Sequence, residues 1–273
     1  MSVKLSDDLE LRDGIWYSNN PNELSYPEDG NDFLFQMEDS IFWFKHRNDS
    51  ISHQVNLHAR KSVFYDIGGG NGSVSKSVQD SGVTTVLIEP GESGCLNAKQ
   101  RGVKNIVCAT FQEALNEEQP ITSIGLFDVL EHIEDDRSFL AEISKKLDKD
   151  GTLVLTVPAY QFLWCVDDDQ VGHYRRYRLS SLCRLLESQG FEIIKRTYLF
   201  SILVLPIFLL RSIPSKFGSK RKYNDPVLIQ KEHGAKSTPR MMTAYLNWES
   251  RMIKKGFKMP FGSSCLVVAK KAT

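Results

Sequence analysis

Short apolar runs alternate with amphipathic stretches along most of the chain. Runs such as "TTVLIE" and "TLVLTV" are typical of strands that are covered on both faces of a sheet. The pattern predicts strands over 62–67, 84–89, 105–108, 121–128, 152–157 and 191–197, and helices over 42–59, 73–80, 93–101, 112–116, 135–147 and 179–189. Repeated strand–helix–strand units favour an α/β fold with a parallel, doubly wound sheet, which binds ligands outside the carboxyl ends of its strands.

Composition narrows the class of protein only a little. The chain has 273 residues, of which 41% are hydrophobic, enough for one large domain with additions. The formal net charge is zero, so no general attraction to nucleic acid is expected. Five scattered cysteines without a CxxC pair indicate a reducing compartment and disfavour a zinc–cysteine site. The N-terminal residues lack the apolar segment of a signal peptide, and we expect a cytoplasmic protein.

The stretch "VFYDIGGGNGS" at 63–73 runs from a strand through a glycine-rich turn into a helix. A P-loop would need a lysine followed by Ser or Thr, and none is present. A dinucleotide site would need a third glycine where Ser73 stands, so the pattern disfavours NAD. Asp66 would repel a pyrophosphate and suits a positively charged group. Glu89 ends the next strand, where a carboxylate can accept both hydroxyls of a ribose. S-adenosylmethionine (SAM) has this combination of adenosine, amino group and sulfonium.

Five stretches in order resemble the motifs of class I SAM-dependent methyltransferases of the broad small-molecule type. They are "DIGGGNG", "VLIEP", "CATFQEAL", "GLFDVLEHIEDDRSFLAEISKKLDKDGTLVLTVPA" and "SLCRLLESQGFEII", and they cover about residues 60–200. The resemblance implies a seven-stranded Rossmann-like sheet whose last strand, at 263–271, is antiparallel. We therefore divide the chain into an N-terminal arm and capping helix (1–60), a SAM-binding core (61–200), an apolar and basic helical insertion (201–262) and the final core strand (263–273).

The resemblance also implies cofactor roles by position. The methionine end would be held by Asp66, Gly68, Gly69 and Gly70, the ribose by Glu89, and the adenine by Pro90, Thr110 and Phe111, while Asp128 would lie along the methionine. The family often has Asp where Thr110 stands. A threonine hydroxyl accepts a weaker hydrogen bond from the adenine amino group than a carboxylate does.

Two histidines are candidate bases. The methyl group of SAM is already activated, so the protein mainly aligns the reactants, but a hydroxyl acceptor also benefits from a base. His132 follows the fourth strand, and a structural or helix-capping role is the alternative for it. His173 lies in the polar loop after the fifth strand. The same loop contains the side chains that we expect to recognise the acceptor: Tyr160, Trp164, Tyr174 and Arg175.

A metal site is not predicted. The run Asp167, Asp168 and Asp169 could be considered for Mg²⁺, but consecutive side chains point in different directions. Hard cations need ligands that converge from several elements.

Two segments outside the shared motifs have two interpretations each. Trp43 and Arg47 share a helix face, so their helix either caps the cofactor, with Arg47 near its carboxylate, or docks by its aromatic residues. The segment "YLFSILVLPIFLLRSI" at 198–213 is too short to span a bilayer. With Lys216, Lys220, Arg221 and Lys222 it forms either a peripheral membrane contact over 198–222 or a lid or homodimer element over the substrate pocket.

We therefore predict a SAM-dependent methyltransferase that acts on an oxygen or nitrogen of a small-molecule or lipid-linked acceptor. Arginines and tyrosines near His173 could serve nucleic acid. However, the sequence after Asp128 lacks the Pro-Pro typical of base amino methylation, so nucleic acid is disfavoured. An NAD-linked oxidoreductase and a SAM-binding protein without turnover remain the alternatives.

Overall fold

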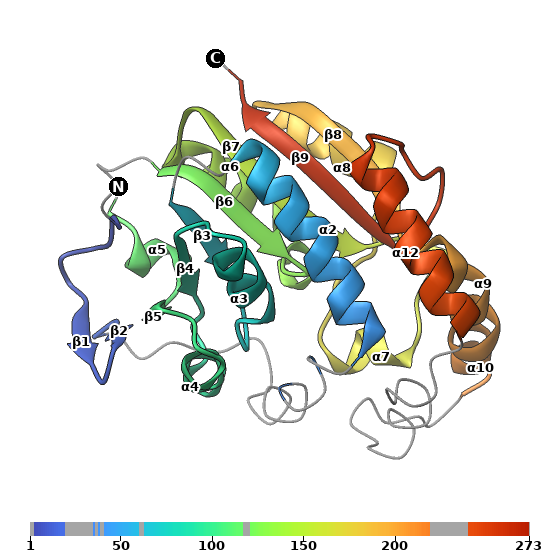
Figure 1. Cartoon of the computed structure of the whole chain (residues 1–273), viewed down its shortest axis with the longest axis horizontal. Helices are drawn as coiled ribbons and strands as arrows, with labels where there is room; N and C mark the ends of the chain where they lie inside the picture. Colours follow the sequence, from blue (N-terminus) through green and yellow to red (C-terminus); the bar gives the residue numbers. More distant parts are fainter. Residues whose placement is uncertain are drawn as a thin grey trace.

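The computed structural model describes residues 3–19, 35, 38, 41–59, 63–116, 121–218 and 240–272. Within these residues one nine-stranded sheet has the order β1-β2-β5-β4-β3-β6-β7-β9-β8 (Figure 1). Its strands are β1 Glu10–Arg12, β2 Ile15–Tyr17, β3 Phe64–Ile67, β4 Thr85–Ile88, β5 Asn105–Cys108, β6 Ile121–Phe127, β7 Leu147–Pro158, β8 Phe191–Leu199 and β9 Ser264–Lys271.

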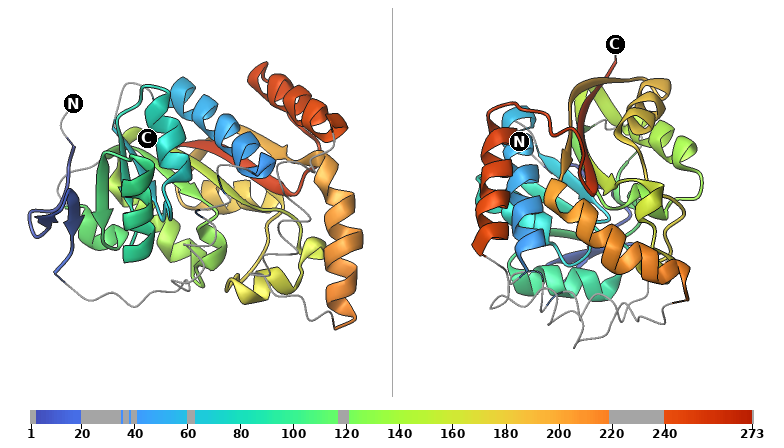
Figure 2. Two further views of the ribbon diagram at one scale, coloured as in Figure 1. Left: turned by 60° about the horizontal axis from the view of Figure 1, so that its bottom comes forward. Right: turned by 90° about the vertical axis from the view of Figure 1, so that its right-hand side faces the viewer.

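Helices cover both faces of the sheet. They are α2 Phe42–His58, α3 Ser73–Asp80, α4 Glu92–Arg101, α5 Phe111–Ala114, α6 Asp136–Lys146, α7 Val166–Gln170, α8 Leu179–Ser188, α9 Val204–Ile207, α10 Ile213–Lys216 and α12 Arg240–Lys254. The views in Figures 1 and 2 place α2, α3 and α12 on one face, and α6 and α8 on the other. Strands covered on both sides explain why the sequence shows continuous apolar runs rather than alternation.

The predicted core of the sheet is confirmed. Each predicted strand and helix between residues 42 and 199 is present, with ends that differ from the prediction by a few residues. The last strand, β9, inserts between β7 and β8 and is antiparallel to both, as Thr152 opposite Lys270 and Phe191 opposite Lys271 show. The family resemblance implied the antiparallel direction of this last strand, and the structure adds its place between β7 and β8.

The N-terminal hairpin was not predicted, and it raises the sheet from seven strands to nine. Arg12 pairs with Ile15, so only Asp13 and Gly14 form the turn. Both have positive φ, 47° and 79°. Positive φ at both central residues is the mark of a type I′ turn, for which Asp-Gly is a favoured pair. The second strand, β2, then adds to the edge of β5 in parallel.

The glycine turn lies where the chain order in the sheet reverses. β3 pairs with β4 on one side and β6 on the other, so the loop after Ile67 opens at the topological switch point. The helix that precedes β3 packs beside the helix that follows this loop. Three polar contacts repeat every fourth residue along both helices: Asn48 with Ser73, Ser52 with Ser77, and Asn56 with Ser81, at 2.8, 2.8 and 2.7 Å. They hold α2 to the helix that begins the cofactor loop.

The first two residues of the apolar segment, Tyr198 and Leu199, belong to β8 rather than to the helical run. Phe200 follows with φ 62°, and a helical run then continues through η3 (Ser201–Leu203), α9, the π-helical η4 (Phe208–Ser212) and α10. None of the helices in the described ranges is both long and apolar enough to cross a membrane. Lys220, Arg221 and Lys222, from the predicted basic cluster, lie outside the described residues.

Candidate active site

A cavity of about 540 Å³ opens at the carboxyl ends of the central strands. All nine residues predicted to bind the cofactor line it, namely Asp66, Gly68, Gly69, Gly70, Glu89, Pro90, Thr110, Phe111 and Asp128. Both candidate bases, His132 and His173, line it as well. Residues from five separate loops are thus gathered around one space.

The glycine turn bends tightly around the cavity wall. Gly68, Gly70 and Gly72 have φ values of 67°, 51° and 74°, in the left-handed region that glycine adopts without strain. A Cβ atom added to Gly70 would meet no protein atom within 4 Å. Gly70 therefore borders open space, and its backbone can approach a ligand closely.

Glu89 fastens this turn from the neighbouring strand. One carboxylate oxygen accepts a hydrogen bond from the Gly70 backbone N–H, and the other accepts one from the Gly91 N–H, both at 2.9 Å. Burial raises the pKa of Glu89, and the two backbone hydrogen bonds oppose that rise. Each oxygen keeps acceptor capacity for a further donor such as a ribose hydroxyl.

Asp66 lies fully buried beneath the glycine turn. Its Oδ2 accepts a 2.7 Å hydrogen bond from Ser75 Oγ, whereas its Oδ1 has no partner among the described residues. Burial raises the pKa of Asp66 to about 7. An unpaired carboxylate oxygen beside a cavity fits a ligand that brings its own cationic donor, and the amino group of SAM is such a donor.

Arg47 reaches from α2 into the cavity wall. Its guanidinium forms an ion pair with Asp128 and lies 4.7 Å from the ring centre of Trp43. Trp43 in turn stacks on Phe200 at 5.3 Å. The helix therefore docks by its aromatic residues and also contributes Trp43 and Arg47 to the cavity wall. That it caps the cofactor, with Arg47 near its carboxylate, stays a prediction.

Two of the residues predicted to contact adenine, Thr110 and Phe111, make different contacts within the protein. Thr110 is the N-cap of α5, and its hydroxyl donates to Glu113 Oε2 at 2.8 Å. Phe111 is buried and packs edge-on against Phe139 at 6.1 Å. Because the Thr110 hydroxyl already donates its hydrogen to Glu113, it can only accept a hydrogen bond from a ligand.

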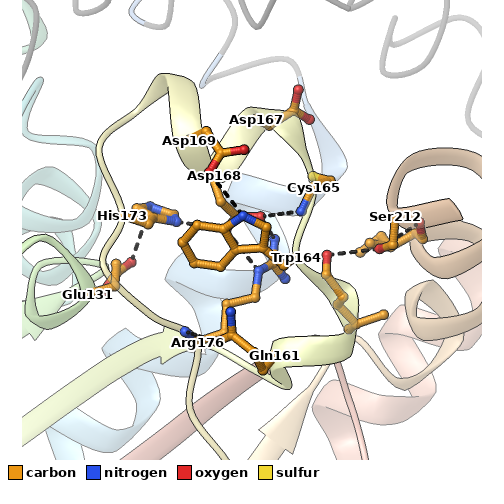
Figure 3. A network of polar contacts seen from close by, with 12 residues as sticks. Glu131, Gln161, Trp164, Cys165, Asp167, Asp168, Asp169, His173, Arg176 and Ser212 are labelled. Atoms are coloured by element: carbon orange, nitrogen blue, oxygen red, sulfur yellow. Dashed lines mark hydrogen bonds and ion pairs between the residues drawn. The ribbon is translucent and has the colours of Figure 1, made fainter. Parts of the chain in front are cut away.

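His173 is held in a fixed orientation by an aspartate. His173 Nδ1 lies 2.8 Å from Asp168 Oδ1. Arg176 donates to both oxygens of Asp168, at 2.8 and 2.9 Å, and the Cys165 N–H donates at 2.9 Å (Figure 3). Burial would raise the pKa of Asp168, but the hydrogen bonds from His173 and Arg176 lower it to about 2. The carboxylate is therefore ionised, and it directs His173 Nε2 away from itself.

Glu131, which was not predicted, stands at the other side of His173. It is fully buried, and neither carboxylate oxygen has a hydrogen-bond partner among the described residues. Its Oε1 lies 3.9 Å from His173 Nε2 (Figure 3). Burial and then the Asp128 charge raise the pKa of Glu131. The adjacent His132 lies 4.6 Å from the His173 ring, and burial lowers its pKa to about 4.

The four residues predicted to bind the acceptor belong to the connection between β7 and α8, but they do not line the cavity. Tyr160 stacks on Tyr198, and the Trp164 indole donates to Asp169. Tyr174 is 51% exposed, and Arg175 forms an ion pair with Asp136 at 2.9 Å. Other side chains take their place along the wall: Asp167, Asp168, Arg176, Ile207 and Arg211.

Solved structures share this fold at low sequence identity. A phosphoethanolamine N-methyltransferase 2 from Haemonchus contortus, in complex with SAM, gives a TM-score of 0.55 at 15% identity over 92% of this chain and 59% of its own. A putative sarcosine dimethylglycine methyltransferase from Galdieria sulphuraria gives 0.54 at 12% over 83% and 85%. The plantazolicin methyltransferase BamL, in complex with a triazolic desmethylPZN analog and SAH, gives 0.54 at 11% over 91% and 92%. No curated protein sequence matches the chain significantly.

The sheet, the glycine turn at its switch point and the carboxylate after the next strand define an α/β enzyme that binds a nucleoside cofactor. The chain belongs to the methyltransferase domain family, whose profile matches residues 45–196. The protein is a SAM-dependent methyltransferase, as predicted from the sequence, and the NAD-linked alternative is set aside.

Proposed function

We propose that the protein methylates an oxygen of a hydroxyl-bearing acceptor, which is either a small molecule or lipid-linked. One observation carries this proposal: an imidazole oriented by a buried aspartate, His173 with Asp168, lines the same cavity as the cofactor residues. A hydroxyl must lose its proton when it is methylated, whereas an amine needs only to arrive neutral. A candidate base on the cavity wall therefore favours methylation of an oxygen over methylation of a nitrogen.

The residues around the glycine turn would hold the cofactor. When bound, SAM supplies an electrophilic methyl group on a sulfonium. Glu89 would accept from the ribose hydroxyls, Asp66 Oδ1 would accept from the amino group, and Gly70 would leave room for the backbone to approach. Arg47, which is already at the wall, would keep Asp128 in place beside the methionine end.

His173 would promote the loss of the acceptor proton. Since Asp168 occupies Nδ1, only Nε2 is free to face the cavity. Glu131 Oε1 lies 3.9 Å from that nitrogen, and the centre of the His132 ring lies 4.6 Å from that of His173. The acceptor hydroxyl would approach this cluster from the open side of the cavity, and the surrounding protein would exclude water from it.

The apolar segment supports an acceptor with apolar character. Ile207 and Arg211, one helical turn apart, line the cavity. On the same helical run, Leu205, Leu209 and Leu210 are 63%, 48% and 71% exposed. The segment thus turns one apolar side chain, Ile207, and one cation, Arg211, toward the cavity, and leucines toward the outside. This arrangement suits either a lid over an acceptor with apolar character or a contact with the membrane that contains a lipid-linked one.

The experiment is methyl transfer from labelled SAM to matched panels of hydroxyl and amine acceptors, with and without lipid vesicles. We expect label in hydroxyl acceptors. His173→Ala should lower the single-turnover rate by about a hundredfold or more and leave SAM affinity nearly unchanged. His58→Ala, on α2, is the matched control and should leave both unchanged. Label confined to amines, or equal single-turnover rates in wild type and His173→Ala, would contradict the proposal; label in protein or nucleic acid alone would do so too.

A further inference from the structure

Three side chains at the acceptor end of the cavity form a set of potential metal ligands. One ligand atom from each of Glu131, His132 and His173 lies within 4.8 Å of the other two. A tetrahedral ion with ligands at about 2.0–2.1 Å separates them by about 3.3 Å. Side-chain rotations that move each ligand atom by about an ångström would therefore bring the three atoms into one coordination shell.

The buried carboxylate of Glu131 points to a ligand that the protein itself does not supply. Both of its oxygens lack hydrogen bonds among the described residues, although the side chain is fully buried. The nearby cations Arg47 and Arg176 are already paired, with Asp128 and Asp168 respectively. A carboxylate without partners in such a place is costly unless a cation or a proton joins it.

Each histidine in the set is oriented by a second partner. His173 Nδ1 is held by Asp168, which leaves Nε2 toward Glu131. The His132 ring has a hydrogen bond with the Val171 backbone. Histidines that bind metals almost always use their second nitrogen in this way, with a carboxylate or a backbone carbonyl as the partner.

We propose that Glu131, His132 and His173 bind one divalent transition-metal ion, of which Zn²⁺ fits the donor set best. Two imidazoles and one carboxylate match catalytic zinc sites, which keep a further position open, whereas Mg²⁺ prefers oxygen ligands. The ion would lower the pKa of an acceptor hydroxyl at the open position, so that His173 acts as a ligand to the activating ion. This role, though not the binding itself, rests on the proposed function.

The site differs from the aspartate run considered in the sequence. There the three side chains diverge: Asp167 faces Arg211, Asp168 holds His173 and Arg176, and Asp169 accepts from Trp164. Only Asp168 takes part, as the partner of a ligand.

Zinc binding to the untagged full chain, stripped with a chelator, tests the inference by calorimetry. We expect one equivalent to bind wild type. Glu131→Gln should weaken binding by roughly a hundredfold or more, and Asp168→Asn, which loses only the orienting contact, by about 10–100-fold. Asp169→Asn is the matched control from the neighbouring residue and should bind like wild type. Equal zinc affinity in wild type and Glu131→Gln would overturn the site.

A second measurement needs no variant. In wild type labelled with ¹⁵N-histidine, one equivalent of zinc should shift the ring nitrogens of two histidines and leave those of His53 and His58 unchanged. Shifts confined to other histidines, or none at all, would overturn the proposal even if the variants failed to fold.

The same preparations separate the ion from the proposed function. Stoichiometric zinc binding at this cluster supports the metal site, even if every hydroxyl acceptor fails. Absence of zinc binding, with hydroxyl methylation that persists in chelator, overturns the metal site and leaves the proposed function standing. Methylation that is lost in chelator and restored by zinc supports both.

Discussion

Arg47 in α2 is joined by an ion pair to Asp128, which follows β6 and lies 81 residues further along the chain. Asp128 has a φ of 58°, in the left-handed region, which is uncommon for residues other than glycine but which Asp and Asn adopt more often than most. The Arg47 and Asp128 side chains are only 10% and 23% exposed. The pair therefore fixes the N-terminal helix against the loop that borders the cavity.

Replacing either Arg47 or Asp128 should lower stability, because the remaining residue loses its partner. We expect Arg47→Gln and Asp128→Asn each to lower the free energy of unfolding by about 1–3 kcal/mol, and the double variant to lose less than the sum. Urea unfolding of all four proteins measures the coupling. Lys76→Gln, which breaks the exposed pair with Asp80, should change stability by less than about 0.5 kcal/mol. Additive losses would show that the Arg47–Asp128 contact contributes nothing.

Glu89→Ala should weaken SAM binding by roughly 2–4 kcal/mol. The change removes the proposed acceptor of the ribose hydroxyls and also the two contacts that hold the Gly70 and Gly91 backbone. Glu92→Ala, in the first turn of α4 with an exposed side chain, is the control and should bind SAM normally. Calorimetry that gives the same affinity for Glu89→Ala and wild type would remove Glu89 from the cofactor site.

A comparison of Gly70 and Gly82, which have similar backbone conformations, distinguishes backbone strain from contact with the ligand. Gly70 and Gly82 both have positive φ, and a Cβ on either would meet no protein atom within 4 Å. Alanine should therefore cost each about 1–2 kcal/mol of stability. Only Gly70→Ala should also lower SAM affinity, by tenfold or more, because its methyl group enters the cavity. Equal SAM affinities in the two variants would reduce the glycine run to a turn.

The raised pKa of Asp66 predicts two opposite pH dependences. Folding favours the protonated carboxyl, since its pKa is about 7 in the folded protein against an ordinary 3.8. The stability contribution is therefore complete below about pH 4 and is lost as the pH rises through 7. SAM affinity should rise over the same interval, because a cationic amino group needs the ionised form. Asp66→Asn should flatten both profiles, and an unchanged affinity profile in this variant would contradict the placement of the amino group.

Exposed leucines on the helical run after β8 predict contact with a lipid surface. Wild type should co-sediment with vesicles that contain phosphatidylserine, and Leu205→Ser with Leu209→Ser should reduce binding several-fold, since each half-buried leucine is worth roughly 1 kcal/mol. Leu57→Ser removes a leucine of similar exposure, 60%, from α2 and is the control. Failure of wild type to sediment would restrict the acceptor to small molecules.

Periodicity predicted the core well because local pattern and packing agree there. The hairpin at Glu10–Tyr17 was missed because strands of three residues have almost no periodic signal, although Asp13-Gly14 is a turn signal that could have found it. The loop after β7 lines the cavity through His173, one of the residues singled out in it, and its role in acceptor recognition stays a prediction. Which of its side chains face the cavity depends on backbone turns, such as the positive φ of Tyr160, that no spacing rule encodes.

The histidine–glutamate cluster could not have been read from the sequence. Glu131 and His132 are adjacent, but His173 lies 41 residues after His132 and reaches them only through the crossover from β6 to β7. Two signals were available: an ionisable pair directly after a central strand, and a third group in the loop after the next strand. They predict proximity at one edge of the sheet, and the unpaired state of Glu131 appears only once the structure shows what surrounds it.

The N-terminal hairpin covers an edge of the sheet that could otherwise pair with another copy of the chain. Without it, β5 would end the sheet and present a free row of backbone donors and acceptors to any passing strand. The hairpin occupies that row with β2 and then ends the sheet in β1, three exposed residues that include Glu10 and Arg12. An edge strand that is so short and charged pairs poorly with a strand of another chain. The hairpin therefore protects the edge of the sheet against intermolecular β-pairing.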